Sequence, residues 1–200
     1  QPHAASGAGE PQGDAKAFLP QLGSGPSFLM VGTIEPRKGH AQTLAAFESL
    51  WREGLDVQLV LVGKQGWMVE VLVDQLRRHP ERGRRLHWLE TIGDEALDQL
   101  YGKASCLIAA SEGEGFGLPL IEAAQHHLPI LARDLPVFRE VAGDHAAYFS
   151  GAGPEDLAGS VRTWLQLYQR GLQPRSNQMG WLTWRQSADA LSRCLPLEEG

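Results

Sequence analysis

The sequence has few cysteines, no long apolar run and no excess of positive charge. Its two cysteines, Cys106 and Cys194, lie far apart among apolar residues. This excludes a disulfide scaffold and favours two buried thiols in a reducing compartment. No segment approaches the roughly 18 apolar residues of a membrane span, and no secretory signal pattern opens the chain. We therefore expect a cytoplasmic protein.

Charge and motifs exclude further classes. With 18 Lys and Arg against 24 Asp and Glu, the chain lacks a general basic field for nucleic acid, so any anion site must be local. The sequence lacks GxGxxG after its first apolar segment, GxxxxGK[ST], HExxH and paired CxxC, and no two aspartates stand two residues apart. We therefore expect no metal and no cofactor, and a nicotinamide-dependent oxidoreductase is disfavoured.

Length and composition fit one large domain with an arm. The 200 residues are 42% hydrophobic and 21% charged, as in an ordinary globular chain. Residues 1–26 are rich in Gly, Ala, Ser, Pro and Gln without a periodic apolar pattern, which predicts a linker or arm. Residues 27–200 then form the domain.

Short apolar segments alternate with amphipathic segments from residue 27 onwards. Strands separated by helices of 10 to 15 residues predict an α/β fold, a Rossmann-like doubly wound parallel sheet with helices on both faces. In such sheets ligands bind at the carboxyl ends of the strands, so the loops after strands should carry the function. The predicted strands are 28–31, 57–62, 86–89, 106–109, 129–132 and 146–149, and the predicted helices are 41–53, 68–78, 94–103 (capped by Asp94), 118–127, 136–141, 154–169 and 181–194.

Two loops after predicted strands carry cations. The loop at residues 32–40 places Arg37 and Lys38 side by side at the start of a helix, where backbone N–H groups and two positive side chains would hold a phosphate or diphosphate. The loop at residues 63–66 adds Lys64. The alternative is that these side chains are merely solvated on turns.

The loop after the fourth predicted strand is rich in glycine and carboxylates. Three glycines in five residues, 113–117, allow the backbone to approach a ligand closely, and the N–H groups of residues 115–118 would face a phosphate across a cleft from Lys38. Glu114 and Glu122 can accept hydrogen bonds from hydroxyl groups. A polyhydroxylated ligand with a diphosphate would satisfy both loops, although exposed loop and helix charges remain the alternative.

Four segments together resemble a known family. VGTIEPRKGH, LVGKQGW, GDEALDQLY and SEGEGFGLPLIEA are similar, from about residue 28 to 149, to the C-terminal donor-binding domain of the family-four retaining glycosyltransferases of the GT-B fold. Glu114 and Glu122 have the spacing of that family's E-x7-E signature. The closing WLTWRQSADAL resembles the C-terminal helix of bacterial mannosyltransferases that build lipopolysaccharide O-antigen.

The resemblance implies a role for each matching residue. Lys38 would bind the diphosphate, Glu114 the sugar hydroxyls and Glu122 the ribose. The family usually has arginine where this chain has Thr33, and Arg37 could supply that charge instead. The remaining positions implied to contact the donor are Gly32, Lys64, Ile92 beside the base, Gly115, Phe116, Gly117 and Leu118.

The resemblance also implies a reaction and its partners. A sugar, with mannose from GDP-mannose favoured, passes to a saccharide or lipid-linked acceptor with retention, and no metal is needed. Because a GT-B enzyme needs two domains and this chain has room for one, we expect the acceptor domain to lie elsewhere and this chain alone to transfer no sugar. We expect the complete enzyme to be peripheral to the inner membrane. The alternatives are a UDP- or ADP-sugar transferase, an epimerase, or a nucleotide-binding or interaction module without catalysis.

Overall fold

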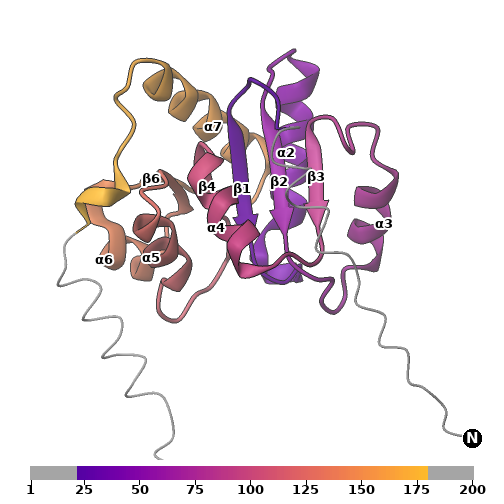
Figure 1. The fold of residues 1–200 in the computed structure, drawn as a ribbon, viewed down its shortest axis with the longest axis horizontal. Coiled ribbons are helices and arrows are strands. Elements are labelled where there is room, and N and C mark those ends of the chain that lie inside the picture. The colour runs from indigo at the N-terminus through magenta and orange to yellow at the C-terminus, as the bar shows by residue number, and fades with distance from the viewer. Residues whose placement is uncertain (1–21, 180–200) are drawn as a thin grey trace, which may run out of the picture.

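Six parallel strands form the centre of the protein, in the order β3-β2-β1-β4-β5-β6 (Figure 1). The computed structural model describes residues 22–179. The strands are β1 (Ser27–Val31), β2 (Gln58–Val62), β3 (Leu86–Leu89), β4 (Cys106–Ala109), β5 (Ile130–Arg133) and β6 (Ala147–Phe149). The helices are α2 (His40–Arg52), α3 (Glu70–Arg78), α4 (Asp94–Lys103), α5 (Leu118–Gln125), α6 (Pro136–Ala142) and α7 (Pro154–Gln169).

Helices cover both faces of the sheet. Because successive residues of a strand point to opposite sides, each strand contributes to a hydrophobic cluster on each face. In β1, Phe28 and Met30 lie in the hydrophobic cluster formed with α2, α3 and α7. Leu29, between them, lies in the second cluster with α4, α5 and α6. The predicted α/β fold with a doubly wound parallel sheet is confirmed. The direction of winding reverses between β1 and β4, which are neighbours in the sheet although β2 and β3 separate them in sequence.

Several predicted boundaries are wrong by a few residues, for identifiable reasons. Helix α3 begins at Glu70 rather than at Met68, because Met68 has a φ of 55°, which a right-handed helix cannot include. Helix α5 ends at Gln125 rather than at His127, whose φ is 56°. Asp94 is the first residue of α4 and not its cap. The cap position is Gly93, and no side chain caps this helix.

Other predictions fall on the ends of the chain. The helix predicted at 181–194, with Cys194, lies outside the described residues, as does most of the predicted linker. Residues 22–26 contain no helix or strand. Cys106 is buried as predicted, and burial raises the pKa of its thiol well above the usual value.

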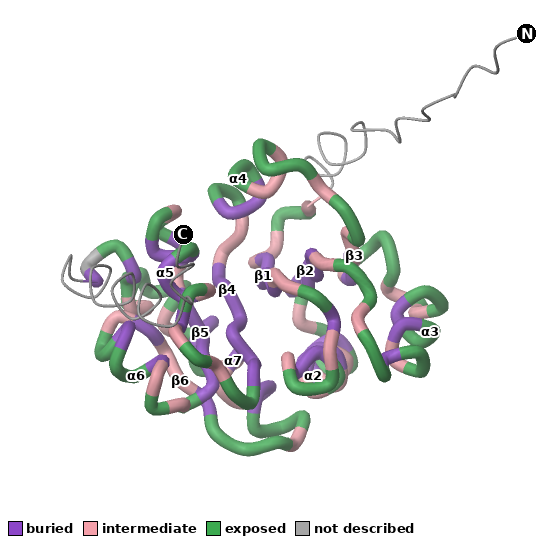
Figure 2. The backbone as a smooth tube through the Cα atoms, turned by 90° about the horizontal axis from the view of Figure 1, so that it is seen from below, coloured by how far each residue is buried: buried purple, intermediate pink, exposed green. Residues whose placement is uncertain are grey.

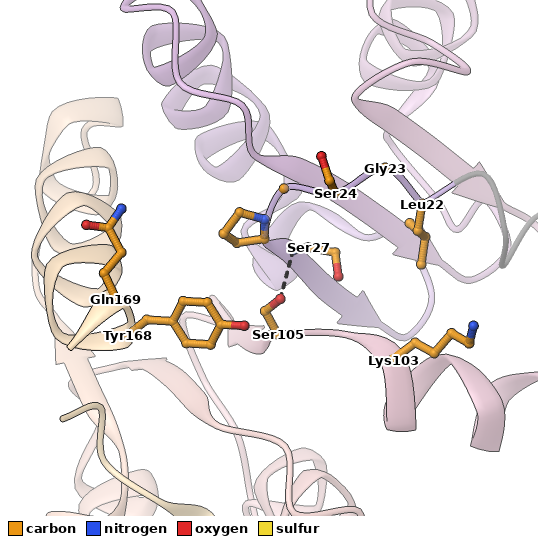
Figure 3. A pocket seen from close by; sticks show the side chains of 10 residues that line it. Leu22, Gly23, Ser24, Ser27, Lys103, Ser105, Tyr168 and Gln169 are labelled. Atoms are coloured by element: carbon orange, nitrogen blue, oxygen red, sulfur yellow. Dashed lines mark hydrogen bonds between the residues drawn. The ribbon is translucent and has the colours of Figure 1, made fainter. Parts of the chain in front are cut away.

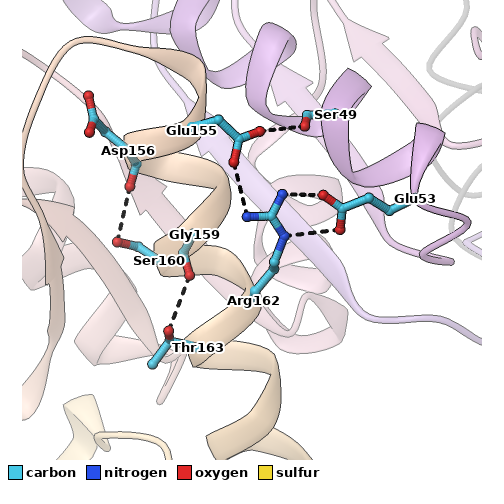
Figure 4. Close-up of polar contacts among 8 residues, drawn as sticks. All are labelled: Ser49, Glu53, Glu155, Asp156, Gly159, Ser160, Arg162 and Thr163. Atoms are coloured by element: carbon cyan, nitrogen blue, oxygen red, sulfur yellow. Dashed lines mark hydrogen bonds and ion pairs between the residues drawn. The ribbon is translucent and has the colours of Figure 1, made fainter.

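Helix α7 returns across the sheet and packs on α2. Trp164 of α7 is buried and meets Phe28 of β1 edge to face, with 5.3 Å between ring centroids. At the surface, Arg162 of α7 forms ion pairs with Glu53 beside α2 and with Glu155, which also accepts a hydrogen bond from Ser49 of α2 (Figure 4). Apolar burial holds the two helices together, since exposed ion pairs contribute little.

Candidate functional site

The loops that follow β1, β2 and β4 meet at the carboxyl edge of the sheet, the edge that faces the viewer in Figure 2. The β1 and β2 loops extend the sheet beyond its strands, because the Ile34 N–H donates to the Lys64 carbonyl and the Gly66 N–H to the Ile34 carbonyl, both at 2.9 Å. The Glu112 N–H donates to the Arg37 carbonyl at 2.8 Å. These backbone bonds fix the three loops relative to one another.

Lys38 and Glu114 form an ion pair at the centre of this edge. The Nζ atom of Lys38 lies 3.1 Å from Oε1 of Glu114, although the two residues are 76 positions apart in sequence. The Lys38 side chain is 37% exposed and that of Glu114 only 15%. Both line a small pocket of about 40 Å³ with residues from the ends of β1 and β4. An ammonium donor and a carboxylate acceptor therefore reach the same space.

Two helices begin at this edge without a side-chain cap. Gly39 precedes α2 and Gly117 precedes α5, and both take the left-handed conformation, with φ of 80° and 68°. No side chain accepts a capping hydrogen bond from the first-turn N–H groups of either helix. The N–H groups of a first turn carry partial positive charge, which favours an anion. Lys38 adds a full positive charge at the start of α2.

His40, the first residue of α2, was given no role by the sequence analysis. It is 4% exposed, lines the same pocket as Lys38, and its Nδ1 atom has no hydrogen-bond partner among residues 22–179. Burial, with a smaller effect of the Lys38 charge, lowers the pKa of His40 to about 4. The imidazole is therefore neutral at physiological pH. The only signal in the sequence is its place directly after the glycine of RKGH.

The low pKa of His40 predicts a loss of stability in mild acid. Between pH 6.5 and pH 4 the unfolded chain binds a proton that folded His40 does not, so the free energy of unfolding falls as the pH falls. Between pH 7 and pH 5 this group should remove about 2 kcal/mol. Urea unfolding at both pH values measures it. The free energy of unfolding of the His40→Gln variant should fall by about 2 kcal/mol less than that of the unaltered chain over the same pH range. His87, whose pKa is also lowered, is present in both proteins, so it does not contribute to the difference. An equal loss in both would contradict the prediction.

Glu122 projects from α5 as an exposed side chain. Its Oε2 atom accepts a hydrogen bond from the hydroxyl of Tyr101 in α4, at 3.3 Å. Tyr101 itself is buried. Tyr101 lies in the segment GDEALDQLY, but the sequence alone indicates no role for it, because the contact requires α4 and α5 to lie on the same face of the sheet.

The other predicted site residues lie around the ion pair without a direct contact that would define their roles. Arg37 belongs to a short 3₁₀ helix, Pro36–Lys38, that the sequence analysis had predicted as loop, and it is exposed. Its side chain has no hydrogen bond or ion pair within the part of the chain described. Thr33, Lys64, Gly115 and Leu118 are exposed, Gly32, Ile92 and Phe116 are partly buried, and Gly117 is buried.

Arg133, at the end of β5, is a third residue for which the sequence alone indicated no role. It is 8% exposed, and its guanidinium donates to the carbonyls of Ala110 and Gly151 and to Oε1 of Gln42 in α2. Burial lowers its pKa from the usual value. The arginine thus ties the end of β4 to α2 and to the loop before α7, and its partner Ala110 lines the pocket that Lys38 and Glu114 also line.

A larger pocket, of about 580 Å³, lies at the opposite edge of the sheet. Figure 3 shows it between residues 22–27, the end of α4 and the end of α7, with Tyr168 pointing into it. At its wall, the Ser27 N–H donates to Oγ of Ser105 at 3.0 Å. This edge holds the amino ends of β1 and β4, and ligands of open α/β sheets bind at the carboxyl ends. We therefore place the functional site at the smaller pocket.

Residues 22–179 contain neither a cluster of metal-binding side chains nor a membrane-spanning helix. No three His, Cys, Asp or Glu side chains in this part of the chain lie close enough together to hold a metal ion. No helix in it has the length and apolar character needed to cross a membrane.

Comparison with known proteins agrees with this geometry. The family model described as glycosyl transferases group 1 matches residues 14–180. The chain belongs to the glycosyl transferase group 1 family. Within that family it is 57% identical over 184 residues to the serotype-specific mannosyltransferase WbdA of Escherichia coli. The aligned segment covers 92% of this chain and 23% of WbdA. The O-antigen chain mannosyltransferase B of the same organism is 37% identical over 58% of this chain and 30% of its own length. The chain thus spans about a quarter of the length of these relatives.

Solved glycosyltransferase structures share the fold. The C-terminal domain of a glycosyl transferase group 1 family protein from Francisella tularensis (LpcC) superposes with a TM-score of 0.67 at 14% identity, covering 95% of each chain. HepE of Anabaena, solved with UDP and glucose, gives 0.69 at 18% identity over 90% of this chain and 50% of its own. The predicted GT-B type of Rossmann-like domain is confirmed by these neighbours.

Proposed function

We propose that this chain is the donor-binding domain of a retaining mannosyltransferase that uses GDP-mannose to extend a lipopolysaccharide O-antigen or another polysaccharide. The observation that carries the proposal is the Lys38–Glu114 ion pair between two uncapped helix starts. A nucleotide diphosphate sugar has an anionic part and a part rich in hydroxyl groups. The ion pair offers a partner for each.

The resting ion pair suggests how the donor would be received. A diphosphate oxygen replaces the Glu114 carboxylate as the partner of Lys38, and the carboxylate is released to accept hydrogen bonds from sugar hydroxyls. The N–H groups at the starts of α2 and α5 add donors to the diphosphate. Glu122, one turn into α5, is placed to bind the ribose. Lys38 and Glu114 then each exchange one partner for another, so that neither is left unpaired.

The reaction follows from the same contacts. The bond between the anomeric carbon and the β-phosphate oxygen breaks, and a bond to the acceptor hydroxyl oxygen forms on the same face of the sugar. The hydroxyl proton passes to a phosphate oxygen of the leaving diphosphate. Lys38 and the helix N–H groups stabilise the negative charge that develops on that diphosphate, which is electrostatic catalysis by groups already in position.

The relatives support the choice of sugar. WbdA and the O-antigen chain mannosyltransferase B are named for mannosyl transfer, the latter to an O-antigen chain. HepE was solved with UDP and glucose, so a nucleotide and a sugar occupy a protein of this fold. On this proposal the acceptor binds to a part of the complete protein outside this chain. The reaction takes place on the cytoplasmic side of the inner membrane.

Thermal unfolding of the chain with ligands tests the proposal. A ligand at a hundredfold its Kd stabilises by about 2.7 kcal/mol, which in a domain of this size raises the Tm by about 5–10 °C. We expect this shift with GDP and GDP-mannose, in EDTA as well as in Mg²⁺. UDP and ADP should give smaller shifts.

Two lysine variants locate the effect. Lys38→Met should abolish most of the shift, because it removes the ammonium group that would meet the diphosphate. Lys103→Met is the matched control, since Lys103 lies beside the pocket at the opposite edge of the sheet, and its shift should equal that of the unaltered chain. A shift that survives Lys38→Met, or the absence of a shift with every nucleotide, would overturn the proposal.

A further inference from the structure

Tyr101 of α4 contacts α5 beside Glu122, the residue predicted to bind the ribose. It lies in α4, is 4% exposed, and stacks on His126 at the end of α5, with 4.6 Å between ring centroids and an angle of 3° between ring planes. His126 in turn lies with Nε2 3.5 Å from Oδ1 of Asp98 in α4. The phenol ring is therefore fixed in place by packing on one side and by a stacked ring on the other.

The hydroxyl of Tyr101 reaches the carboxylate of Glu122. It donates to Oε2 of Glu122 at 3.3 Å, and within residues 22–179 it is the only hydrogen-bond partner of the Glu122 side chain. Burial, with the Glu122 charge as the second cause, raises the pKa of Tyr101, so the phenol remains a protonated donor at all working pH values. The contact therefore has one direction, from the phenol to the carboxylate.

An exposed glutamate on a helix is otherwise free to rotate about three side-chain bonds. A rigid donor on Oε2 favours the rotamers that keep this contact, and Oε1 has no hydrogen-bond partner among residues 22–179. Ordering these rotamers before a ligand arrives reduces the entropy that binding must offset. A carboxylate can accept about four hydrogen bonds, so the contact with Tyr101 leaves enough capacity for two hydroxyl groups.

We propose that Tyr101 is a positioning residue that orients the Glu122 carboxylate toward the two vicinal hydroxyl groups of the donor ribose. The inference rests on the proposed function and adds a residue to it. Tyr101 does not touch the ligand. It sets the geometry of Glu122 from the buried face of α4, so the discrimination for ribose over a deoxysugar depends on a residue outside the binding surface.

Tyrosine-to-phenylalanine variants test this with little risk to the fold. Tyr101→Phe keeps the ring that stacks on His126 and removes only the hydroxyl. We expect the Kd for GDP, measured by calorimetry on the chain, to rise about three- to tenfold, which is less than the loss of a direct hydrogen bond to a charged group would cause, because Tyr101 acts through Glu122. Tyr148→Phe is the matched control, because the Tyr148 hydroxyl donates to the carbonyls of Phe138 and Gly143, with no carboxylate of the site involved. Its Kd should not change.

Two further measurements separate positioning from a general structural effect. For 2′,3′-dideoxy-GDP, which lacks both hydroxyls, Tyr101→Phe should change the Kd less than twofold. In a Glu122→Ala background, Tyr101→Phe should cause no further loss for GDP. An equal loss for GDP and the dideoxy analogue, an additive loss in the double variant, or an unchanged Kd for GDP would each overturn the inference. If the unaltered chain binds neither ligand, the proposed function itself fails.

Discussion

Replacing Gly39 by alanine should cost about 2–5 kcal/mol of stability, because two penalties combine at this position. The residue has a φ of 80°, and a side chain in the left-handed region costs about 1–2 kcal/mol. A Cβ atom at residue 39 would also lie 2.3 Å from the Ala110 carbonyl oxygen. Relieving such overpacking typically costs a further 1–3 kcal/mol or so. The backbone that carries Lys38 would have to move away from β4.

Gly54, at the other end of α2, provides the control for this change. Its φ is 83°, but a Cβ atom there would meet nothing within 4 Å. Gly54→Ala should therefore show only the conformational cost, about 1–2 kcal/mol. Urea unfolding of both variants measures the difference, and nucleotide-induced stabilisation should be weakened in Gly39→Ala alone. Equal losses of stability would mean that the close approach of residue 39 to β4 has no energetic consequence.

Replacing Arg133 by alanine should destabilise the protein by about 3–5 kcal/mol. The Ala110 carbonyl would lose both of its bonds to the guanidinium, and Oε1 of Gln42 would lose its bond of 2.6 Å. The Gly151 carbonyl would keep its bond from Nε2 of Gln42. Buried acceptors without partners cost about 1–3 kcal/mol each, and the space left by the side chain adds to this.

Arg139 offers a matched comparison for Arg133. Its guanidinium also lies over an aromatic ring, that of Tyr148, as that of Arg133 lies over Phe149. It forms a two-bonded ion pair with Asp134, but its side chain is half exposed. Water can replace those bonds, so Arg139→Ala should leave the Tm almost unchanged. If the two variants lower the Tm equally, the buried network around Arg133 does not contribute to stability.

The sequence was sufficient for the fold class because the signals are local. Buried strands such as Gln58–Val62 and Cys106–Ala109 are short, mainly apolar segments, and the helices between the strands show helical spacing. The residues that ended up at the carboxyl edge could also be predicted, since every loop after a strand of a parallel sheet reaches that edge.

The contacts within the site could not be predicted, because they depend on which strands are neighbours. The pairing of Lys38 with Glu114 requires β1 to lie beside β4, which no local pattern encodes. The hydrogen bond from Tyr101 to Glu122 likewise requires α4 and α5 on one face. Arg133 appeared only as the residue after an apolar run, and its four hydrogen bonds come from segments that are distant in sequence.

The separation of Lys38 and Glu114 by 76 positions in the sequence also sets an order of events during translation. At roughly 5–20 residues per second, the ribosome releases Glu114 roughly 4–15 s after Lys38. Strands β1, β2 and β3 can pair in that interval, because they are consecutive in sequence. The edge of β1 that later pairs with β4 then stays open, and open strand edges invite pairing with other chains. Arrival of β4 closes that edge and brings the carboxylate to the lysine in the same step.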